Sequence, residues 1–310
     1  MLKIGVVGLG NIAQKAYLPV MAAMQDQVEW ILCTRNSDKL AQLKKQYGFQ
    51  QSASSVTELL AQQPNAVFLH TPTATHGTLI RQFLLAGVHV YVDKPVSTDL
   101  AEVAALYQLA AERHLLLTCG FNRRFAPLNQ RLVQATPPNV IVAQKNRLAT
   151  EQPVAFAIFD LLIHVVDTGL YLAGPLDLTT AKRHFTLTTN ANGMLAFCGI
   201  TLTTADQTIY LLMNMDAGVN REITQVQRPT GMAEVIDLSQ LQSASAAGVT
   251  TVQLPDWTPT LTQRGFAPLI KAFVQAVADQ HPTNPVSATS SIAAHQLCTE
   301  LLQWWQNPAK

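Results

Sequence analysis

Charged side chains are scarce in this chain. Lys, Arg, Asp and Glu make up 13% of its 310 residues, against roughly a quarter in typical soluble domains. With 21 basic and 20 acidic residues and no basic cluster, the sequence lacks the electrostatic footprint of a protein that binds nucleic acid or an anionic membrane. We expect neither partner. Because hydrophobic residues reach 48%, we expect part of the surface to be buried between subunits.

Cysteine pairs, metal motifs and long apolar runs are also missing. The four cysteines stand far apart with no C-x-x-C pair, which favours reduced, buried thiols. There is no H-E-x-x-H motif, so no metal is expected. No basic and apolar leader precedes the first strand-like run, and no apolar run reaches the length of about 18 residues that a membrane span needs. These absences predict a cytoplasmic protein.

What is present is an alternation of strand and helix patterns in the first part of the chain. Five apolar, β-rich runs are separated by segments of helical period. The strand-like runs are 2–7, 28–33, 66–70, 88–92 and 115–119. Such alternation predicts a parallel, doubly wound sheet.

A glycine turn follows the first strand and opens a helix. In the run Gly8-Leu9-Gly10-Asn11-Ile12-Ala13, Gly8 permits a tight turn, Gly10 lets a pyrophosphate approach the backbone, and Ala13 allows close packing of helix on strand. The helix start at Asn11 and Ile12 then faces the phosphates. The motif predicts a dinucleotide-binding Rossmann domain, which we assign to residues 1–122.

The end of the second strand bears on which dinucleotide is bound. An NAD site usually has an acidic residue there to hold the ribose hydroxyls, but this chain has Thr34 and Arg35. A hydroxyl and a guanidinium suit a 2′-phosphate, which a carboxylate would repel. We therefore expect NADP(H), with NAD(H) possible. In the alternative interpretation Arg35 is solvated and Asp38 reaches back to the ribose.

The pattern changes after residue 122. A long apolar helix is expected at 155–172, and several strand-like runs follow one another with short polar turns. They are 140–148, 181–188, 194–203, 207–215, 221–228 and 232–237. This succession predicts an α+β domain over 123–310 with an antiparallel or mixed sheet. Helices at 267–279 and 287–305 end the chain and could pack back on the first domain.

Two segments carry candidate catalytic groups. Lys94, in Asp93-Lys94-Pro95, follows an apolar strand, at the sheet edge where open α/β sheets bind ligands. An ammonium held there could fix a substrate hydroxyl, although a surface lysine is the commoner interpretation of the tripeptide alone. Asp160, His164 and Asp167 share one face of the long helix. A histidine flanked by carboxylates can act as a general base, and a buried hydrogen-bonded network is an equal alternative.

The order of these motifs resembles that of the Gfo/Idh/MocA oxidoreductases. It is carried by the glycine turn, by Thr71-Pro72-Thr73-Ala74-Thr75-His76, by Asp93-Lys94-Pro95, by Gly120-Phe121-Asn122-Arg123-Arg124-Phe125 and by 160–164. Within the family, the phrases 121–127 and 164–168 look most like the MviM-type proteins. Asp93, Thr73 and Leu162 depart from the usual glutamate, asparagine and glycine. The resemblance implies a Rossmann domain followed by an open-faced sheet domain that forms homodimers or homotetramers.

The resemblance also implies a reaction and residue roles. The implied activity is hydride transfer between NAD(P) and a carbinol or carbonyl carbon of a sugar, cyclitol or derivative. His164 would exchange the hydroxyl proton, Lys94 would hold the same oxygen, and Asp160 would orient the substrate or the lysine. Asn122 and Arg124 are expected beside the substrate. The residues expected on the cofactor side are Thr71, Pro72, Thr73, His76 and Asp93. A reductase of a non-sugar carbonyl or a dihydrodiol, and a non-catalytic cofactor sensor, are the alternatives.

Overall fold

A computed structural model describes residues 1–134 and 136–307. The chain forms two compact units, each with its own sheet. The first unit consists of Met1–Gly120 and Phe266–Ala288, and the second of Phe121–Gly265 and Thr289–Lys310. Each unit is therefore built from two stretches of the chain.

The first unit contains a six-stranded sheet in the order β3-β2-β1-β4-β5-β6. All neighbouring strands pair in parallel, which confirms the predicted doubly wound sheet. The strands are β1 (Leu2–Val7), β2 (Val28–Cys33), β3 (Gln51–Ala53), β4 (Ala66–Leu69), β5 (His89–Val92) and β6 (Leu117–Cys119). The strand order reverses between β1 and β4, and open α/β sheets bind their ligands at such a point.

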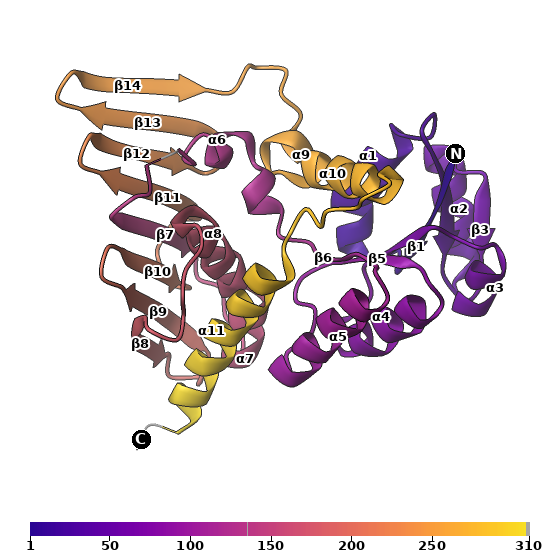
Figure 1. Cartoon of the computed structure of the whole chain (residues 1–310), viewed down its shortest axis with the longest axis horizontal. Coiled ribbons are helices and arrows are strands. Elements are labelled where there is room, and N and C mark those ends of the chain that lie inside the picture. Colours follow the sequence, from indigo (N-terminus) through magenta and orange to yellow (C-terminus); the bar gives the residue numbers. More distant parts are fainter. Residues whose placement is uncertain (135, 308–310) are drawn as a thin grey trace. The chain divides into compact units, whose positions relative to one another are not determined.

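The helices of the first unit cover both faces of this sheet. They are η1 (Ala13–Tyr17), α1 (Leu18–Ala22), α2 (Ser37–Tyr47), α3 (Val56–Ala61), η2 (Thr73–Thr75), α4 (His76–Leu85), α5 (Leu100–Glu112) and α10 (Phe266–Ala278). In Figure 1, α4 and α5 lie on one side of the sheet, and α1 and α10 on the other. Strands buried on both faces are apolar almost throughout, and every residue of β4 is buried.

The sequence analysis missed β3 and α3. Both segments are short, β3 has the polar sequence Gln-Ser-Ala, and β3 pairs only at the edge of the sheet. An edge strand of three residues has no alternating pattern to detect. We had predicted that Lys94 follows the fourth strand of the sheet. Because β3 was missed, the strand that precedes Lys94 is in fact the fifth.

An aromatic cluster ties α10 to the first unit. The ring of Phe273 packs edge-on against Phe68 at 5.1 Å between centroids and lies 5.5 Å from Tyr91. Phe266 lies 5.5 Å from Tyr17. Aromatic side chains bury large apolar areas, so this cluster explains why a helix from the far end of the chain completes the first core.

The second unit contains an eight-stranded sheet in the order β14-β13-β12-β11-β7-β10-β9-β8. Its strands are β7 (Val140–Asn146), β8 (Lys182–Thr189), β9 (Leu195–Thr203), β10 (Thr208–Asn214), β11 (Arg221–Arg228), β12 (Gly231–Ile236), β13 (Gln240–Ser245) and β14 (Gly248–Gln253). Strands β7 and β10 pair in parallel, and the other pairs are antiparallel. This mainly antiparallel sheet confirms the predicted fold class. The polar hairpin β13–β14 at one edge escaped the sequence analysis.

Helices cover one face of the second sheet (Figure 1). They are η3 (Asn122–Phe125), α6 (Pro127–Gln130), α7 (Val154–Ala157), η4 (Ile158–Leu162), α8 (Ile163–Ala173), α9 (Thr260–Gln263) and α11 (Ala288–Gln306). Helix α8 approaches β10 closely at Gly169, where a Cβ atom would lie 2.3 Å from Leu211. The tight contact holds α8, and the polar residues it carries, against the sheet.

The stretch Val154–Ala173 is long and apolar enough to cross a membrane by length and composition, although the sequence analysis had found no such run. Within its most apolar window, however, 72% is buried in the structure. The core helix of a protein that never meets a membrane passes the same test. The stretch is therefore weak evidence for a membrane span.

Candidate active site

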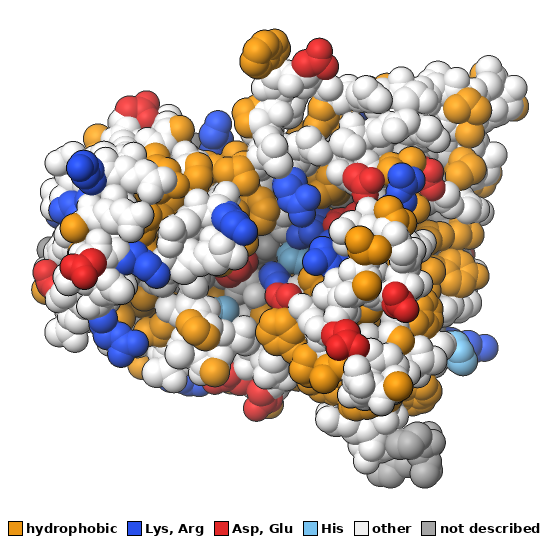
Figure 2. Space-filling model, turned by 180° about the vertical axis from the view of Figure 1, so that it is seen from behind, with side chains coloured by type: hydrophobic (Ala, Val, Ile, Leu, Met, Phe, Trp, Pro, Cys, Tyr) orange, Lys and Arg blue, Asp and Glu red, His pale blue; other side chains and the backbone are white. Residues whose placement is uncertain are grey.

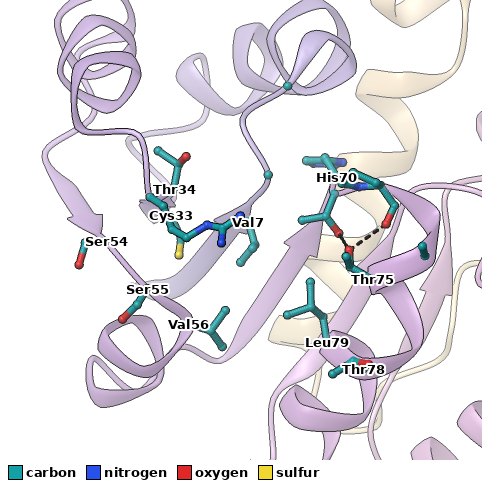
Figure 3. Close-up of a pocket in the computed structure, with 16 residues that line it drawn as sticks. Val7, Cys33, Thr34, Ser54, Ser55, Val56, His70, Thr75, Thr78 and Leu79 are labelled. Atoms are coloured by element: carbon teal, nitrogen blue, oxygen red, sulfur yellow. Dashed lines mark hydrogen bonds between the residues drawn. The ribbon is translucent and has the colours of Figure 1, made fainter.

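A cavity of about 660 Å³ lies at the carboxyl ends of β1 to β4 in the first unit (Figure 3). It sits at the point where the strand order reverses, as expected for a dinucleotide site. Its walls come from the loops after four strands. The lining residues are Val7, Gly8, Gly10, Cys33, Thr34, Arg35, Ser54, Ser55, Val56, His70, Thr71, Pro72, Ala74, Thr75, Thr78 and Leu79.

The glycine turn fits a bound pyrophosphate. Gly8 has φ +91°, and a Cβ atom there would lie 2.7 Å from the backbone of His70 and Thr71. Gly10 lines the cavity, and a Cβ atom on it would meet no atom within 4 Å among the described residues. The helix begins at Asn11, so its first N–H groups follow directly on this open space and can bind an anion.

The end of β2 supplies the groups that could contact the adenosine end of a cofactor. Arg35 is exposed and lines the cavity, and its side chain has no hydrogen bond or ion pair within residues 1–134 and 136–307. The Thr34 hydroxyl accepts from the N–H of Asn36 at 3.3 Å. Asn36 in turn caps α2 by accepting from the N–H of Lys39. Asp38 lies exposed in the first turn of that helix.

His70 is a pocket residue that the sequence analysis missed, because a histidine ending a buried strand is typical of a core position. It lines the cavity, its exposure is 6%, and its ring stacks on Tyr17 with 3.9 Å between centroids. Neither ring nitrogen has a hydrogen-bond partner in the described part of the chain. Burial, and then the nearby His76, lowers the pKa of His70 to about 3. A neutral imidazole therefore lines the cavity, with both ring nitrogens buried and without a hydrogen-bond partner among the described residues.

We expect His70 to destabilise the protein in acid. An unfolded histidine titrates near pH 6.5, whereas the pKa of His70 is about 3. Between these values the unfolded chain binds a proton that the folded protein excludes, so the free energy of unfolding falls by about 1.4 kcal/mol for each pH unit below 6.5. Urea denaturation at several pH values between 7 and 5 gives the slope of the free energy of unfolding against pH. In His70→Phe, which keeps a ring against Tyr17, this slope should be smaller by about the same amount.

A matched control is His281→Asn, which removes a histidine at an exposed position and should leave the slope as in the wild type. A slope in His70→Phe equal to that of the wild type would show that His70 does not stay neutral in the folded protein.

Lys94 leaves the sheet beside the cavity loop. Leu69 of β4 pairs with Val92 of β5, so Thr71 and Lys94, each two residues further on, follow neighbouring strands. The Lys94–Pro95 peptide bond is cis. The N–H of Lys94 donates to Asp93 Oδ1 at 3.1 Å. Lys94 is partly exposed, which leaves it accessible at the carboxyl edge of the sheet.

Asp93 positions this turn. Its Oδ1 also accepts from the Tyr17 hydroxyl at 3.2 Å, and that hydroxyl lies 3.0 Å from the Tyr91 hydroxyl. Burial raises the pKa of Asp93, while the Lys94 charge opposes the shift. Gly120 makes room for the network, since a Cβ atom there would lie 2.8 Å from the Tyr91 hydroxyl. The carboxyl group of Asp93 thus holds the backbone of Lys94 in place.

His76 connects the cavity loop to the lysine turn. The side chain is 1% exposed, with Nδ1 at 2.8 Å from the carbonyl oxygen of Pro95 and Nε2 at 2.9 Å from that of Thr71. Both partners are acceptors. The ring therefore acts as a strut between the two loops that carry Thr71 and Lys94.

The cofactor residues predicted from the sequence fall into two groups. Those that line the cavity are Gly8, Gly10, Thr34, Arg35, Thr71 and Pro72. Those that do not line it are Asn11, Ile12, Thr73, His76, Asp93 and Lys94. His76 is buried and Asp93 is partly buried, and the polar atoms of both are bound by protein partners, which makes them positioning residues. Asn11 is exposed at the first residue of the helix that leads into η1, and Thr73 is partly exposed at the start of η2.

The second unit brings Asp160 and His164 together on one helical stretch. Asp160 lies in the π-helical turn η4, and His164 in the first turn of α8. Such π turns are rare and frequently occur at functional sites. His164 is 8% exposed, and its carbonyl oxygen accepts from the Thr168 hydroxyl at 2.7 Å. Leu162, which replaces the usual glycine, is fully buried.

Asp167 does not serve His164 as the sequence pattern suggested. Its carboxylate binds Arg124 instead, with Arg124 Nε at 2.9 Å from both oxygens and Nη2 on Oδ1. Arg124 Nη2 also donates to the Ser290 hydroxyl. Burial raises the pKa of Asp167, and the Arg124 charge opposes the shift. Of the two interpretations of Asp167, the buried network is therefore correct, and Arg124 is a structural partner rather than an open pocket residue.

Asn122 is likewise used within the second unit. It is fully buried, its Nδ2 donates to the carbonyl oxygen of Arg264 at 2.7 Å, and its Oδ1 accepts from Arg123 at 3.1 Å. Gly265, with φ +80°, packs so closely that a Cβ atom would lie 2.0 Å from the Asn122 carbonyl oxygen. Asn122 was expected beside the substrate, but its side chain instead links the segment that enters the second unit to the segment that leaves it.

Among the described residues, there is no group of three or more His, Cys, Asp or Glu side chains placed to hold a metal ion. The four cysteines are buried, and none of them forms a disulfide within the described residues. The fold and the cavity thus define a class: an oxidoreductase with a dinucleotide-binding Rossmann unit and a second unit with a mixed sheet.

Comparison with known proteins agrees with this class. Residues 2–121 match the model of the oxidoreductase family with an NAD-binding Rossmann fold, and residues 127–246 match the YceM-like C-terminal domain. The YceM protein of Salmonella typhimurium is 34% identical over 307 residues, which is 97% of each chain. This chain belongs to the Gfo/Idh/MocA family of oxidoreductases, as the motif order indicated.

Solved structures of the family have the same fold. A Gfo/Idh/MocA family oxidoreductase from Vibrio cholerae aligns over 100% of both chains with a TM-score of 0.89 and 30% identity. The dehydrogenase MviM from Clostridium difficile aligns over 97% of this chain and 99% of its own, with a TM-score of 0.90 and 29% identity. The match to MviM confirms the predicted subgroup.

Proposed function

We propose that this protein is an NAD(P)-dependent dehydrogenase of a polyhydroxylated substrate, a sugar, a cyclitol or a derivative of one. The observation that carries the proposal is the position of Lys94. It leaves the sheet beside Thr71, a lining residue of the dinucleotide cavity, and His76 bridges the two loops. A cation held there can reach a substrate oxygen next to the bound cofactor.

The proposed roles fall on three residues, Lys94, Asp160 and His164. When bound, the cofactor supplies the nicotinamide carbon that takes or returns the hydride. His164 accepts the hydroxyl proton in the direction of oxidation, and Lys94 donates a hydrogen bond to the same oxygen and stabilises its negative charge. Asp160, one turn before His164 on the same helical stretch, orients the substrate.

The substrate class is supported by relatives. The UDP-N-acetylglucosamine 3-dehydrogenase of Acidithiobacillus ferrooxidans is 33% identical over 187 residues, or 57% of this chain. The myo-inositol 2-dehydrogenase of Thermotoga maritima is 28% identical over 186 residues. Their names give a nucleotide sugar and a cyclitol as substrates, and in this chain Lys94 and His164 would serve an alcohol of such a compound.

A substrate panel tests this proposal. The full-length protein is incubated with NADP⁺ or NAD⁺ and with sugars, cyclitols, nucleotide sugars and amino-sugar derivatives, and the absorbance of the reduced nicotinamide is followed. We expect turnover of at least one polyhydroxylated compound. Turnover confined to non-sugar carbonyls or dihydrodiols would contradict the proposed substrate class. Cofactor binding without any turnover would contradict the proposed reaction.

We further propose that NADP(H) is preferred over NAD(H). The exposed guanidinium of Arg35 lines the cavity and has no protein partner within the described residues, so it is available to a 2′-phosphate. We expect the wild type to bind NADPH more tightly than NADH. Arg35→Asp should weaken NADPH binding by about tenfold or more and leave NADH binding close to that of the wild type.

Nicotinamide fluorescence on titration measures both dissociation constants. Asp38→Asn is the matched variant, because it changes the acidic residue that would hold the ribose in the alternative interpretation. Tighter binding of NADH by the wild type, with NADH binding weakened in Asp38→Asn, would reverse the assignment.

A further inference from the structure

A buried cluster of charges lies at one end of the second sheet. Lys145 of β7 and Glu222 of β11 stand directly opposite each other in the strand register, with 2.8 Å between Lys145 Nζ and Glu222 Oε2. Arg123 approaches the same carboxylate with both arms, at 3.1 Å from Nε to Oε1 and 3.2 Å from Nη2 to Oε2. The exposures of Lys145 and Arg123 are 8% and 5%. One carboxylate therefore serves two buried cations.

A third cation joins this cluster. Arg264 follows α9, and within the described residues its guanidinium has neither a hydrogen bond nor an ion pair. Burial lowers the pKa of Arg264, the charge of Arg123 lowers it further, and Glu222 opposes the shift. Arg123, Lys145 and Arg264 against Glu222 leave two positive charges without a counter-charge. Partly buried cations without counter-charges are costly, so the arrangement is suited to receiving an anion.

The neighbouring carboxylate of Asp167 does not neutralise the excess positive charge of the cluster. Asp167 also feels Arg123, but its carboxylate is bound to Arg124, and that pair is neutral by itself. Asp167 is on α8, one turn beyond His164. Helix α8 packs against β7 and β11, the strands that carry Lys145 and Glu222. The cluster therefore lies beside the helix that bears the proposed proton acceptor.

We propose that Arg264, with Arg123 and Lys145 behind it, binds an anionic group of the substrate, a carboxylate or a phosphate. The inference rests on the proposed function and narrows its substrate class to polyhydroxylated acids or phosphate esters. Arg264 provides the accessible donor fork, which matches the two oxygens of such a group. Glu222 pairs with both Arg123 and Lys145 and so offsets the repulsion between these two cations.

The state of Lys145 gives the site a pH dependence. Burial, opposed by Glu222 and reinforced by the charges of Arg123 and Arg264, lowers the pKa of Lys145 to about 8. Above this pH the ammonium loses its proton and the cluster loses one positive charge. Binding of a carboxylate, whose own charge is constant over this range, should therefore weaken as the pH rises from 7 to 9.

Calorimetric titration of the full-length protein tests the site. The probes are inorganic phosphate and D-glucuronate, with D-glucose as the uncharged analogue of the latter. We expect at least one anion to bind with a dissociation constant at least about tenfold lower than that of D-glucose, and Arg264→Gln to raise that constant by about tenfold or more. Arg221→Gln is the control, since Arg221 is an exposed residue next to Glu222 on the same strand.

Arg264→Gln is a mild change, because the fold uses the backbone of Arg264 through Asn122 and not its guanidinium. Circular dichroism and NADPH binding should match the wild type. If neither anion binds more tightly than D-glucose, or if both variants weaken binding equally, the anion site is refuted.

The outcome is separable from that of the proposed function. Anion binding that depends on Arg264, without turnover of any compound in the substrate panel, would uphold the anion site and refute the dehydrogenase. Turnover of neutral polyols only, with no anion binding, would uphold the dehydrogenase and refute the anion site.

Discussion

Lys94→Ala should lower turnover by about a hundredfold or more, the scale of one lost acid–base or electrostatic group, while cofactor binding persists. The ammonium follows β5 at the sheet edge and does not line the cavity, so its removal leaves the dinucleotide walls intact. The turn itself is held by the Asp93 carboxyl group through the backbone N–H of Lys94, which alanine retains. The local structure should therefore survive the substitution.

The measurement is steady-state turnover on a substrate found in the panel, together with the NADPH dissociation constant. Lys45→Ala, at an exposed position on α2, is the matched control and should be as active as the wild type. Lys94→Arg keeps the charge but moves it, and we expect only partial activity. Full turnover in Lys94→Ala would remove Lys94 from the catalytic groups.

Asp167→Ala should destabilise the second unit by about 3–5 kcal/mol, the usual cost of removing one partner from a buried ion pair. Asp167 is 1% exposed and Arg124 is 6% exposed, so solvent cannot replace the lost carboxylate. The guanidinium of Arg124 would remain packed near the rings of Phe121 and Tyr171, at 5.8 Å and 5.4 Å, with its main counter-charge removed.

Urea denaturation followed by far-UV circular dichroism measures the change. The double variant Arg124→Met/Asp167→Leu should recover most of the loss, because it removes both charges and fills the space with apolar atoms. Arg221→Gln removes an exposed arginine 3.9 Å from Asp237 and should cost less than about 0.5 kcal/mol. A loss of that small size in Asp167→Ala would mean that the Arg124–Asp167 pair does not stabilise the unit.

Patterns of hydrophobicity predicted the strong elements well. β1, β2, β4 and β5 are apolar and buried on both faces, and the amphipathic strand β7 alternates buried and partly exposed residues. The strands that escaped prediction are β3, β13 and β14, which lie at or near sheet edges and consist mainly of Gln, Ser, Thr, Ala and Gly with few apolar residues. Such strands are held by backbone pairing, which leaves no period in the sequence.

Single-residue roles were harder to predict than elements. Helical spacing predicted that Asp160, His164 and Asp167 share one face. It could not predict that Arg124 binds Asp167, because these two residues are 43 positions apart in the sequence. The same holds for His70, because the sequence does not show that its ring nitrogens lack a hydrogen-bond partner among the described residues. A histidine at the end of an apolar strand is consistent with both a core and a pocket position until its neighbours are known.

By itself, the sequence determined the class of protein: the glycine turn after the first strand, the strand–helix alternation and the motif order are local, and local patterns are legible without a fold. Only the tertiary structure decided which polar side chains are hydrogen-bonded or ion-paired to other residues. Asn122, Arg124 and Asp93 became positioning residues, whereas Arg35, His70 and Arg264 kept polar atoms without a described partner. The physical reason is that a side chain's chemistry depends on its partners in space, and these come from distant parts of the chain.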